Sequence, residues 1–310
     1  MRVIFLGTPE FALNVLKGIA KSKHTIVGVV TQTDKINARG NKVVFSKVKE
    51  FALENNYSVF QYKNISLEGE QELRALNADI MVTAAYGQIL RQNILDICKH
   101  GIINVHASLL PKYRGSSPVQ WALINGEKTI GVSIMQTELG IDIGDVILSK
   151  EITLQGEENS AQALEILSNI GAQAVVEALN FIESGKATFT KQNNLEATHC
   201  RMLTKEDGLM DFSKKASELV NFIRGMTPWP SAYTESINGR IKILKAVECD
   251  FVGGSNFGEV VASDIKNGII VKCGENYIKV LEIQGENSKA MDAKSYLLGK
   301  KLPVGSVLGG

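Results

Sequence analysis

The chain opens with Met1-Arg2-Val3-Ile4-Phe5-Leu6-Gly7-Thr8-Pro9-Glu10-Phe11, in which a short apolar run meets a glycine and then a proline. A run of this kind that stops at a turn residue is typical of a buried strand. Pro9 stands where the first turn of a helix tolerates a missing N–H. The stretch therefore predicts a strand, a tight turn and a helix, the beginning of a βαβ unit. The helix is indicated by apolar residues at helical spacing, namely Phe11, Val15, Leu16 and Ile19.

The rest of the first half repeats this alternation of β-rich apolar runs and helix-period segments. Such alternation predicts an α/β domain in which helices cover a mainly parallel sheet. The expected strands are Val3–Leu6, Ile26–Val30, Ile80–Ala84, Ile102–Val105 and Val132–Met135.

The first strand-to-helix turn disfavours a dinucleotide as the ligand of this sheet. It contains one glycine, Gly7, and places the acidic Glu10 where a pyrophosphate would lie. The dinucleotide fingerprint has three glycines instead. An open α/β sheet can still bind a ligand, because loops and helix N-termini converge beyond the carboxyl ends of its strands. We therefore expect a Rossmann-like sheet with a different ligand.

The second half of the chain predicts a small β domain. Periodicity fades in a polar stretch from Lys186 to Lys205, which suggests a linker. Beyond it come a helical stretch at Leu219–Ile223, the break Pro228-Trp229-Pro230, and short β-like runs whose spacing indicates a closed or half-closed barrel. We expect a first domain over 1–185, a linker over 186–206 and a barrel-like domain over 207–310. The expected strands of the barrel are Ile241–Leu244, Glu259–Ala262, Ile269–Cys273 and Tyr277–Ile283.

Length and composition agree with two globular domains. The chain has 310 residues, and single cores usually stop growing near ~250 residues. Its 44% hydrophobic and 22% charged composition argues against bulk disorder, and a net charge of +1 means that an anionic polymer would need a local basic patch. The apolar N-terminus is short for a signal peptide and no run of ~20 apolar residues follows, so a cytoplasmic protein without a membrane partner is expected. The four cysteines form no CxxC pair, which predicts neither disulfides nor a metal site.

Candidate chemistry lies in the segment 101–115, which begins as a strand and then becomes polar and turn-rich. Asn104 and His106 occupy alternate positions near the strand end, so their side chains share one face. An amide can donate to a developing oxyanion, and an imidazole can exchange a proton near neutral pH. This pair suits acyl transfer, although a single histidine near a strand end also fits a purely structural hydrogen bond.

A carboxylate follows the next expected strand, in the segment Thr137–Asp145. Asp142 has a glycine on either side at a distance of two residues, which allows close approach of the backbone to a ligand. An aspartate between glycines is often only a turn residue. Because Asp142 comes soon after a strand, we expect it at the same end of the sheet as Asn104 and His106.

A basic segment without acidic residues extends from Lys35 to Lys49. Such a run can contact phosphates, and it also fits a solvated loop without a partner. Its basic residues are Lys35, Arg39, Lys42, Lys47 and Lys49.

Taken together, these segments resemble the methionyl-tRNA formyltransferase family over nearly the whole chain. The Asn/His/Asp set and the SLLP-to-RG stretch are specific to formyltransferases in general, whereas the basic loop, the linker and the second domain resemble the tRNA-binding members. The loop departs from the usual family pattern at Ile36-Asn37-Ala38 and Val43-Val44-Phe45. The matching motifs are Gly7-Thr8-Pro9-Glu10-Phe11-Ala12, Arg39-Gly40, Ala85-Tyr86-Gly87-Gln88-Ile89-Leu90, Asn104-Val105-His106, Ser108-Leu109-Leu110-Pro111, Arg114-Gly115, Asp142, Glu206-Asp207-Gly208 and Pro228-Trp229-Pro230.

The resemblance implies a Rossmann-like formyltransferase domain and a C-terminal OB-like domain that binds tRNA. It implies transfer of the formyl group of 10-formyltetrahydrofolate to the α-amino group of methionyl initiator tRNA, without a metal and in a monomer. Asn104, His106 and Asp142 are then catalytic, and Arg39 and Lys42 contact tRNA. The folate co-substrate is expected against Gly87, Gln88, Ile89, Leu90, Ser108, Leu109, Leu110 and Pro111.

Three other functions remain open on the sequence. The acceptor could be a smaller amine, such as an amino sugar or glycinamide ribonucleotide. A related enzyme could hydrolyse formylfolate and release formate. An RNA-binding module on the same fold would bind tRNA without folate-dependent transfer, but it would have no use for Asn104, His106 and Asp142.

Overall fold

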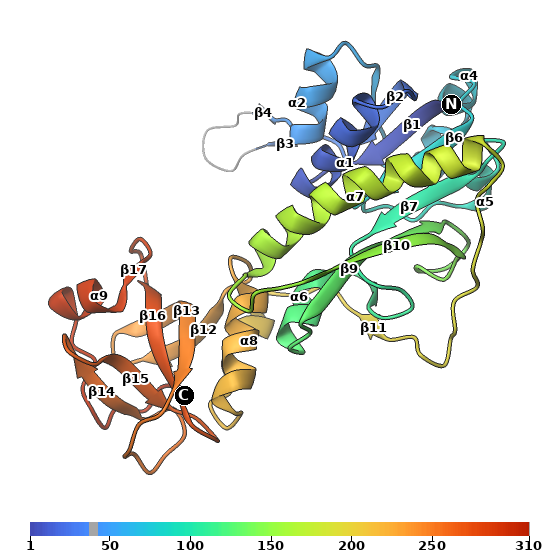
Figure 1. The fold of residues 1–310 in the computed structure, drawn as a ribbon. Coiled ribbons are helices and arrows are strands. Elements are labelled where there is room, and N and C mark those ends of the chain that lie inside the picture. Colours follow the sequence, from blue (N-terminus) through green and yellow to red (C-terminus); the bar gives the residue numbers. More distant parts are fainter. Residues whose placement is uncertain (37–42, 310) are drawn as a thin grey trace. The chain divides into compact units, whose positions relative to one another are not determined.

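The computed structural model describes residues 1–36 and 43–309 of the chain (Figure 1). Its contacts divide the chain into two compact units. The first unit comprises residues 1–115, 129–152 and 164–200, and the second comprises residues 116–128, 153–163 and 201–310. The chain crosses between the units more than once, so neither is one continuous segment. The domain limits that we expect at residues 185 and 206 stay a prediction.

A seven-stranded sheet forms the centre of the first unit, in the order β10-β9-β7-β6-β1-β2-β5. Neighbours from β7 to β5 pair in parallel, and β9 pairs antiparallel with β7. The mainly parallel α/β sheet is thus confirmed, and all five predicted strands are present. The strands are β1 (Arg2–Gly7), β2 (Thr25–Thr31), β5 (Val59–Gln61), β6 (Ile80–Ala84), β7 (Ile102–His106), β9 (Thr129–Gln136) and β10 (Val146–Thr153).

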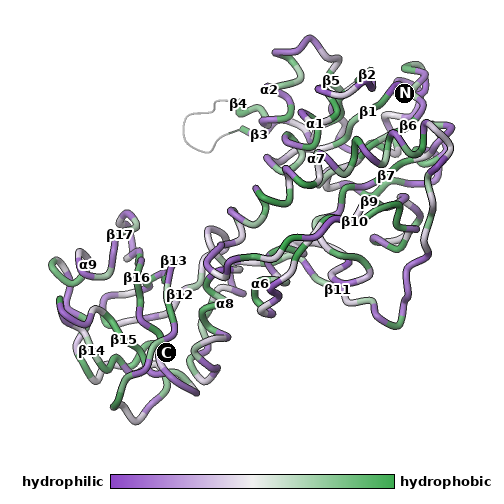
Figure 2. Tube along the Cα trace, viewed as in Figure 1, coloured by the Kyte–Doolittle hydropathy of each residue, from purple (hydrophilic) through white to green (hydrophobic). Residues whose placement is uncertain are grey.

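Helix α7 (Ser160–Glu183) lies directly on this sheet through small residues. A Cβ atom on Gly171 would lie 3.0 Å from Val105 on β7 and 3.7 Å from Val132 on β9. Helix α1 (Glu10–Ala20) approaches α7 as closely, since a Cβ on Gly18 would meet the Ala172 carbonyl at 2.7 Å. Hydrophobic and hydrophilic residues alternate along α7 (Figure 2), as expected for a helix that buries one face.

Gly7 at the first turn is explained by packing. A Cβ there would lie 2.6 Å from Ala12 and 2.8 Å from the Ala84 carbonyl. Only a glycine lets α1 begin so close to the ends of β1 and β6. The next residue, Thr8, accepts a hydrogen bond from the backbone N–H of Gln32 through Oγ1, so the turn is also tied to the end of β2.

The direction of β9 corrects one prediction. The register pairs His106 with Ser133 and Ile103 with Gln136, so β9 ends beside the beginning of β7. We expected Asp142 at the same end of the sheet as His106 because it follows this strand, and that reason was wrong. The alternation of side chains along a strand carries no information about strand direction. The connection between β9 and β10, residues 137–145, therefore has to run back along the sheet to reach the site.

The second unit holds an antiparallel sheet with the strand path β12-β13-β16-β15-β14, and β17 pairs with β16. Helix α8 (Ala216–Met226) buries Leu219 and Ile223 in one core with strand residues such as Ile243 and Val271. The predicted helix and β domain are confirmed. Within the described residues β12 and β14, the two ends of the strand path, do not pair, so the sheet resembles a half-closed barrel. Its elements are β12 (Ala232–Ser236), β13 (Gly239–Cys249), β14 (Val260–Asp264), β15 (Gly268–Lys272), β16 (Tyr277–Gly285), β17 (Met291–Asp292) and α9 (Ala293–Gly299).

The remaining elements are short, and several of them carry site residues. No helix among residues 1–36 and 43–309 is long and apolar enough to span a membrane. The short elements are β3 (Lys35–Ile36), β4 (Val43–Val44), α2 (Lys47–Glu54), α3 (Ile65–Glu68), α4 (Glu70–Ala75), α5 (Gln92–Leu95), β8 (Arg114–Gly115), α6 (Pro118–Ile124), β11 (His199–Cys200) and the 3₁₀ helix η1 (Glu206–Gly208).

Candidate active site

Asn104 projects from the middle of β7 and is oriented by the neighbouring strand. Thr83 on β6 is directly opposite in the register, and its Oγ1 donates a hydrogen bond of 2.8 Å to Asn104 Oδ1. The oxygen of the amide is therefore occupied. Across the described residues, Asn104 Nδ2 has no protein acceptor, so the donor side of the amide is left for a ligand. This is the orientation that oxyanion stabilisation requires.

His106 ends β7 and is 6% exposed. Its Nε2 lies 2.9 Å from the carbonyl oxygen of Tyr113, and its Nδ1 lies 3.6 Å from Asp142 Oδ2. A carbonyl oxygen only accepts, so Nε2 carries a proton. Nδ1 is then the ring nitrogen that can gain or lose a proton, and it faces the carboxylate.

Asp142 reaches His106 from the loop between β9 and β10. Its backbone is left-handed, with φ of 53°, and its Oδ2 accepts a 2.8 Å hydrogen bond from the Gly115 N–H. Gly144 permits a close return of the loop, since a Cβ there would lie 1.9 Å from the Gln136 carbonyl. The structure thus brings His106 and Asp142 together as expected, although by a different path of the chain.

Gly115, whose N–H binds Asp142, is itself fixed by a short parallel strand pairing that was not predicted from the sequence. Strand β8 pairs with β11, with Gly115 opposite Cys200. Gly115 has φ of 105°, and a Cβ on it would lie 2.4 Å from the Cys200 carbonyl, so only glycine fits. Thr198 adds two contacts, because it accepts from the N–H groups of Tyr113 and Arg114. Residues 198–200 belong to the stretch that we expected to be a linker.

Arg114 beside this pairing is 4% exposed and is held by two neutral amides. Its Nε donates to Gln192 Oε1 at 3.0 Å, and its Nη2 donates to Asn194 Oδ1 at 2.9 Å. Gln192 Nε2 in turn donates to the carbonyls of Asp142 and Gly144, at 2.9 and 2.7 Å. Sequence reasoning missed Gln192 and Asn194, since a polar stretch without periodicity gives no signal for partners 50 to 80 residues away.

The turn after β7 is held by serine hydroxyls. Ser108 Oγ donates to the Lys112 carbonyl at 2.7 Å, and Ser133 Oγ accepts from the Leu110 N–H at 3.0 Å. Leu109 packs on β9, because a Cβ on Gly131 would lie 2.4 Å from Leu109 Cδ2. The hydroxyl of Ser108 and the side chain of Leu109 are therefore engaged within the protein.

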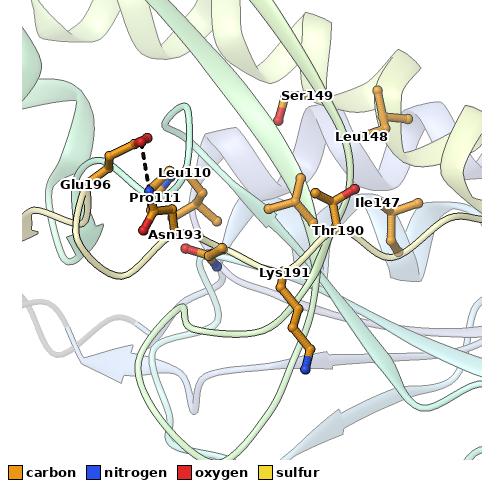
Figure 3. A pocket seen from close by; sticks show the side chains of 11 residues that line it. Leu110, Pro111, Ile147, Leu148, Ser149, Thr190, Lys191, Asn193 and Glu196 are labelled. Carbon is orange, nitrogen blue, oxygen red and sulfur yellow. Dashed lines mark hydrogen bonds between the residues drawn. The ribbon is translucent and has the colours of Figure 1, made fainter.

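Leu110 and Pro111 border a pocket of about 360 Å³ (Figure 3). The pocket has an apolar wall from the turn and from β10, and a polar wall from the stretch after α7. Figure 3 shows the hydrogen bond that Asn193 donates to Glu196 at its rim. The pocket is lined by Leu110, Pro111, Val146, Ile147, Leu148, Ser149, Thr190, Lys191, Gln192, Asn193 and Glu196.

The second predicted folate segment follows β6, which is parallel to β7, so it leaves the sheet at the same edge as Ser108–Pro111. Gly87 has φ of 86°. The side chain of Gln88 accepts from the N–H of Ile65 and donates to the carbonyl of Tyr62, so it fixes the segment to its surroundings. Ile89 is 83% exposed whereas Leu90 is buried, which makes Ile89 the apolar side chain available to a ligand.

Two further predictions concern the basic loop and metal binding. Arg39 and Lys42 lie outside the described residues. In the described part of the chain, no group of three or more histidine, cysteine or acidic side chains is placed to hold a metal ion.

Burial, with the nearby charge of Asp142, raises the pKa of the Cys200 thiol to about 11, so this thiol is protonated at neutral pH.

Comparison with known proteins agrees with this fold. Residues 1–179 match the family model described as formyl transferase, and residues 202–301 match that of the formyl transferase C-terminal domain. The protein is a formyltransferase. It is 43% identical over 310 residues to the methionyl-tRNA formyltransferase of Caldanaerobacter subterraneus subsp. tengcongensis, with 99% of this chain and 100% of the relative covered. It is 42% identical to that of Lachnospira eligens, with 100% of both chains covered. The chain therefore belongs to the methionyl-tRNA formyltransferase family.

Solved structures share the fold at low sequence identity. A sugar 3N-formyltransferase, crystallised in the presence of dTDP and 5-N-formyl-THF, has a TM-score of 0.68 at 20% identity, with 93% of this chain and 99% of that chain covered. The methionyl-tRNA formyltransferase of Clostridium thermocellum has a TM-score of 0.55 at 16% identity, with 80% and 94% covered. These structures support the Rossmann-like fold of the family.

Proposed function

We propose that this protein transfers the formyl group of 10-formyltetrahydrofolate to the α-amino group of methionyl initiator tRNA, a step in translation initiation. The observation that carries the proposal is the cluster at the end of β7, where Asn104 presents its donor group and His106 faces Asp142 at 3.6 Å. Full-length similarity to methionyl-tRNA formyltransferases supports the choice of acceptor.

The reaction needs one bond to form and one to break. The amine nitrogen attacks the formyl carbon, a tetrahedral oxyanion forms, and the bond to N10 of the folate breaks with return of a proton to N10. In this proposal Asn104 Nδ2 donates to the oxyanion, a contact of a kind that is typically worth ~2.7–4 kcal/mol. No covalent bond to the protein is required.

His106 and Asp142 handle the proton in this proposal. His106 Nδ1 is the available basic nitrogen, because Nε2 donates to the Tyr113 carbonyl. Asp142 stabilises the imidazolium that forms when Nδ1 takes a proton from the attacking amine. General acid–base assistance of this kind contributes about 10²–10⁴-fold to the rate.

The folate segments Gly87–Leu90 and Ser108–Pro111 remain proposals, as do their individual contacts. Their support is that they follow the adjacent parallel strands β6 and β7, and that Ile89 is exposed at this edge. Because Gln88 and Ser108 use their side chains within the protein, we expect them to contact the folate through the backbone.

Binding of tRNA is assigned to Arg39, Lys42 and the domain over 207–310. We further propose domain limits of 1–185, 186–206 and 207–310, a cytoplasmic location and a monomeric state. Phosphate contacts release counterions, so affinity for tRNA should fall steeply with salt. Gel filtration with light scattering tests the monomer directly.

A transfer assay tests the proposed reaction. Purified protein is mixed with 10-formyltetrahydrofolate and, in separate reactions, methionyl initiator tRNA, an amino sugar nucleotide or glycinamide ribonucleotide. We expect formyl transfer to the tRNA, with strong salt dependence, and none to the small amines. Transfer to a small amine alone, or formate release without acceptor, would refute the proposed acceptor. Normal turnover of both His106→Ala and Asp142→Ala would refute the proposed roles.

A further inference from the structure

We infer that Gln192 is a positioning residue that holds the Asp142 loop in its reactive arrangement, an inference that rests on the proposed function. Gln192 lies in the polar stretch after α7, 50 residues beyond Asp142 in the chain. Its side chain makes three hydrogen bonds, two of them to this loop and one to Arg114.

The loop around Asp142 has few apolar anchors. Ile141 is 62% exposed and Ile143 is 41% exposed, so burial of these neighbours does little to fix the backbone. Asp142 itself is left-handed, a conformation that costs about 1–3 kcal/mol for a residue other than glycine and persists only where the surroundings enforce it. Hydrogen bonds must therefore supply the restraint, and Gln192 supplies two of them.

The two restraints on Asp142 act on different parts of the residue. The Gly115 N–H binds the carboxylate, at 2.8 Å from Oδ2. Gln192 Nε2 binds the carbonyls of Asp142 and Gly144, at 2.9 and 2.7 Å, and so sets the backbone from which the carboxylate projects. Loss of the second restraint lets the loop shift while the side chain keeps one contact.

Arg114 fixes the direction in which Gln192 can act. A guanidinium only donates hydrogen bonds, so the Nε of Arg114 requires an acceptor and selects Oε1 of Gln192. The amide donor Nε2 is then forced toward the Asp142 loop. The buried Arg114 thus fixes the orientation of the Gln192 amide, so that Oε1 accepts from the arginine and Nε2 donates to the loop.

Gln192→Glu separates positioning from a structural role, because it keeps the acceptor for Arg114 and removes the donor to the loop. We expect it to stay folded, because the new carboxylate pairs with the buried Arg114, and thermal unfolding checks this. Its kcat should fall by about 10–100-fold, the scale expected when a reacting group is displaced by about 1 Å. KM for folate and for tRNA should stay within about threefold, because Gln192 contacts neither substrate in this proposal.

Asn194→Asp is the matched control. It makes the same amide-to-carboxylate change beside the same Arg114, but the contact of Asn194 is to Nη2 and not to the Asp142 loop. We expect near wild-type kcat. A loss in Asn194→Asp as large as that in Gln192→Glu would place the cause in a charge beside Arg114 and overturn the inference.

The deciding measurement is a double-mutant cycle in single-turnover formyl transfer. If Gln192 acts through Asp142, Gln192→Glu should cost little further rate on an Asp142→Ala background, so the two losses should not add. Equal losses on both backgrounds, or unchanged kcat in Gln192→Glu, would overturn the inference. A wild-type protein active only on another amine would refute the proposed acceptor instead, and the same cycle is then measured with that amine.

Discussion

Thr83→Val tests how the structure orients the proposed oxyanion donor. Thr83 is 7% exposed, and its Oγ1 donates to Asn104 Oδ1 at 2.8 Å. Valine has nearly the same shape, so the packing between β6 and β7 is retained while the hydroxyl is lost. Without that donor, the amide of Asn104 can rotate and present its oxygen to the ligand.

The expected loss lies between two limits. A neutral hydrogen bond contributes about 0.5–1.5 kcal/mol net, and complete loss of an oxyanion donor costs about 2.7–4 kcal/mol. Because Asn104 is still present but less well oriented, the activation free energy should rise by about 1–2 kcal/mol. That rise corresponds to a roughly 5–30-fold fall in kcat.

The assay is single-turnover formyl transfer at saturating substrates, with Thr83→Val, Asn104→Ala and the double variant measured side by side. Thr83 acts only through Asn104 in this argument, so the double variant should lie within about twofold of Asn104→Ala. Thr31→Val is the control, because Thr31 is also buried in the same sheet but donates to the Gln32 carbonyl. Wild-type kcat in Thr83→Val, or additive losses in the double variant, would refute the reasoning.

Three other outcomes are expected. His106→Ala should lower kcat by about 10²–10⁴-fold, measured by transfer rate on protein that thermal unfolding shows to be folded; a loss below tenfold contradicts a role in proton transfer. Gly115→Ala should lower both the unfolding midpoint and kcat, since its Cβ would lie 2.4 Å from the Cys200 carbonyl, and a wild-type midpoint would contradict this. Hydrogen bonds, first from the Arg201 side chain and second from the Thr204 N–H, hold the pKa of Asp207 well below its usual range. This carboxylate therefore stabilises the folded state at pH values above its ordinary pKa, and the stabilisation is lost as pH falls through the pKa of the folded state. In Asp207→Asn, the free energy of unfolding measured with urea should therefore fall less steeply below about pH 4 than in the wild type.

In the seven-stranded sheet, the strands that the sequence predicted are those with unbroken apolar runs. β1, β6 and β7 are buried along nearly their whole length, and such runs are read directly from the residues. β5 is only three residues long and half-buried, and most of β10 alternates half-buried with exposed residues at the edge of the sheet, so neither gave the same signal. In this sheet, the local sequence pattern therefore revealed strands buried on both faces more readily than strands buried on one face.

The candidate site was predictable to the extent that its residues lie within one segment. Asn104 and His106 share a strand face, and this follows from their spacing alone. The approach of Asp142 was expected for an incorrect reason, because β9 runs opposite to β7 and the loop returns to the site. Whether a strand runs parallel or antiparallel depends on how it pairs with its neighbour in the sheet, which is a property of the tertiary fold.

Gln192 illustrates why the rest of the site needed the structure. Its position resembles a linker in composition, yet its amide connects a buried arginine to the backbone of the proposed catalytic carboxylate. Pairing of β8 with β11 adds a second connection, through Gly115 and Cys200. Both connections join residues more than 45 positions apart, and neither leaves a local pattern of hydrophobicity or charge. A polar, aperiodic stretch can thus be as constrained as a core strand when its side chains satisfy buried polar groups, and substitutions there should be judged by the partners they lose.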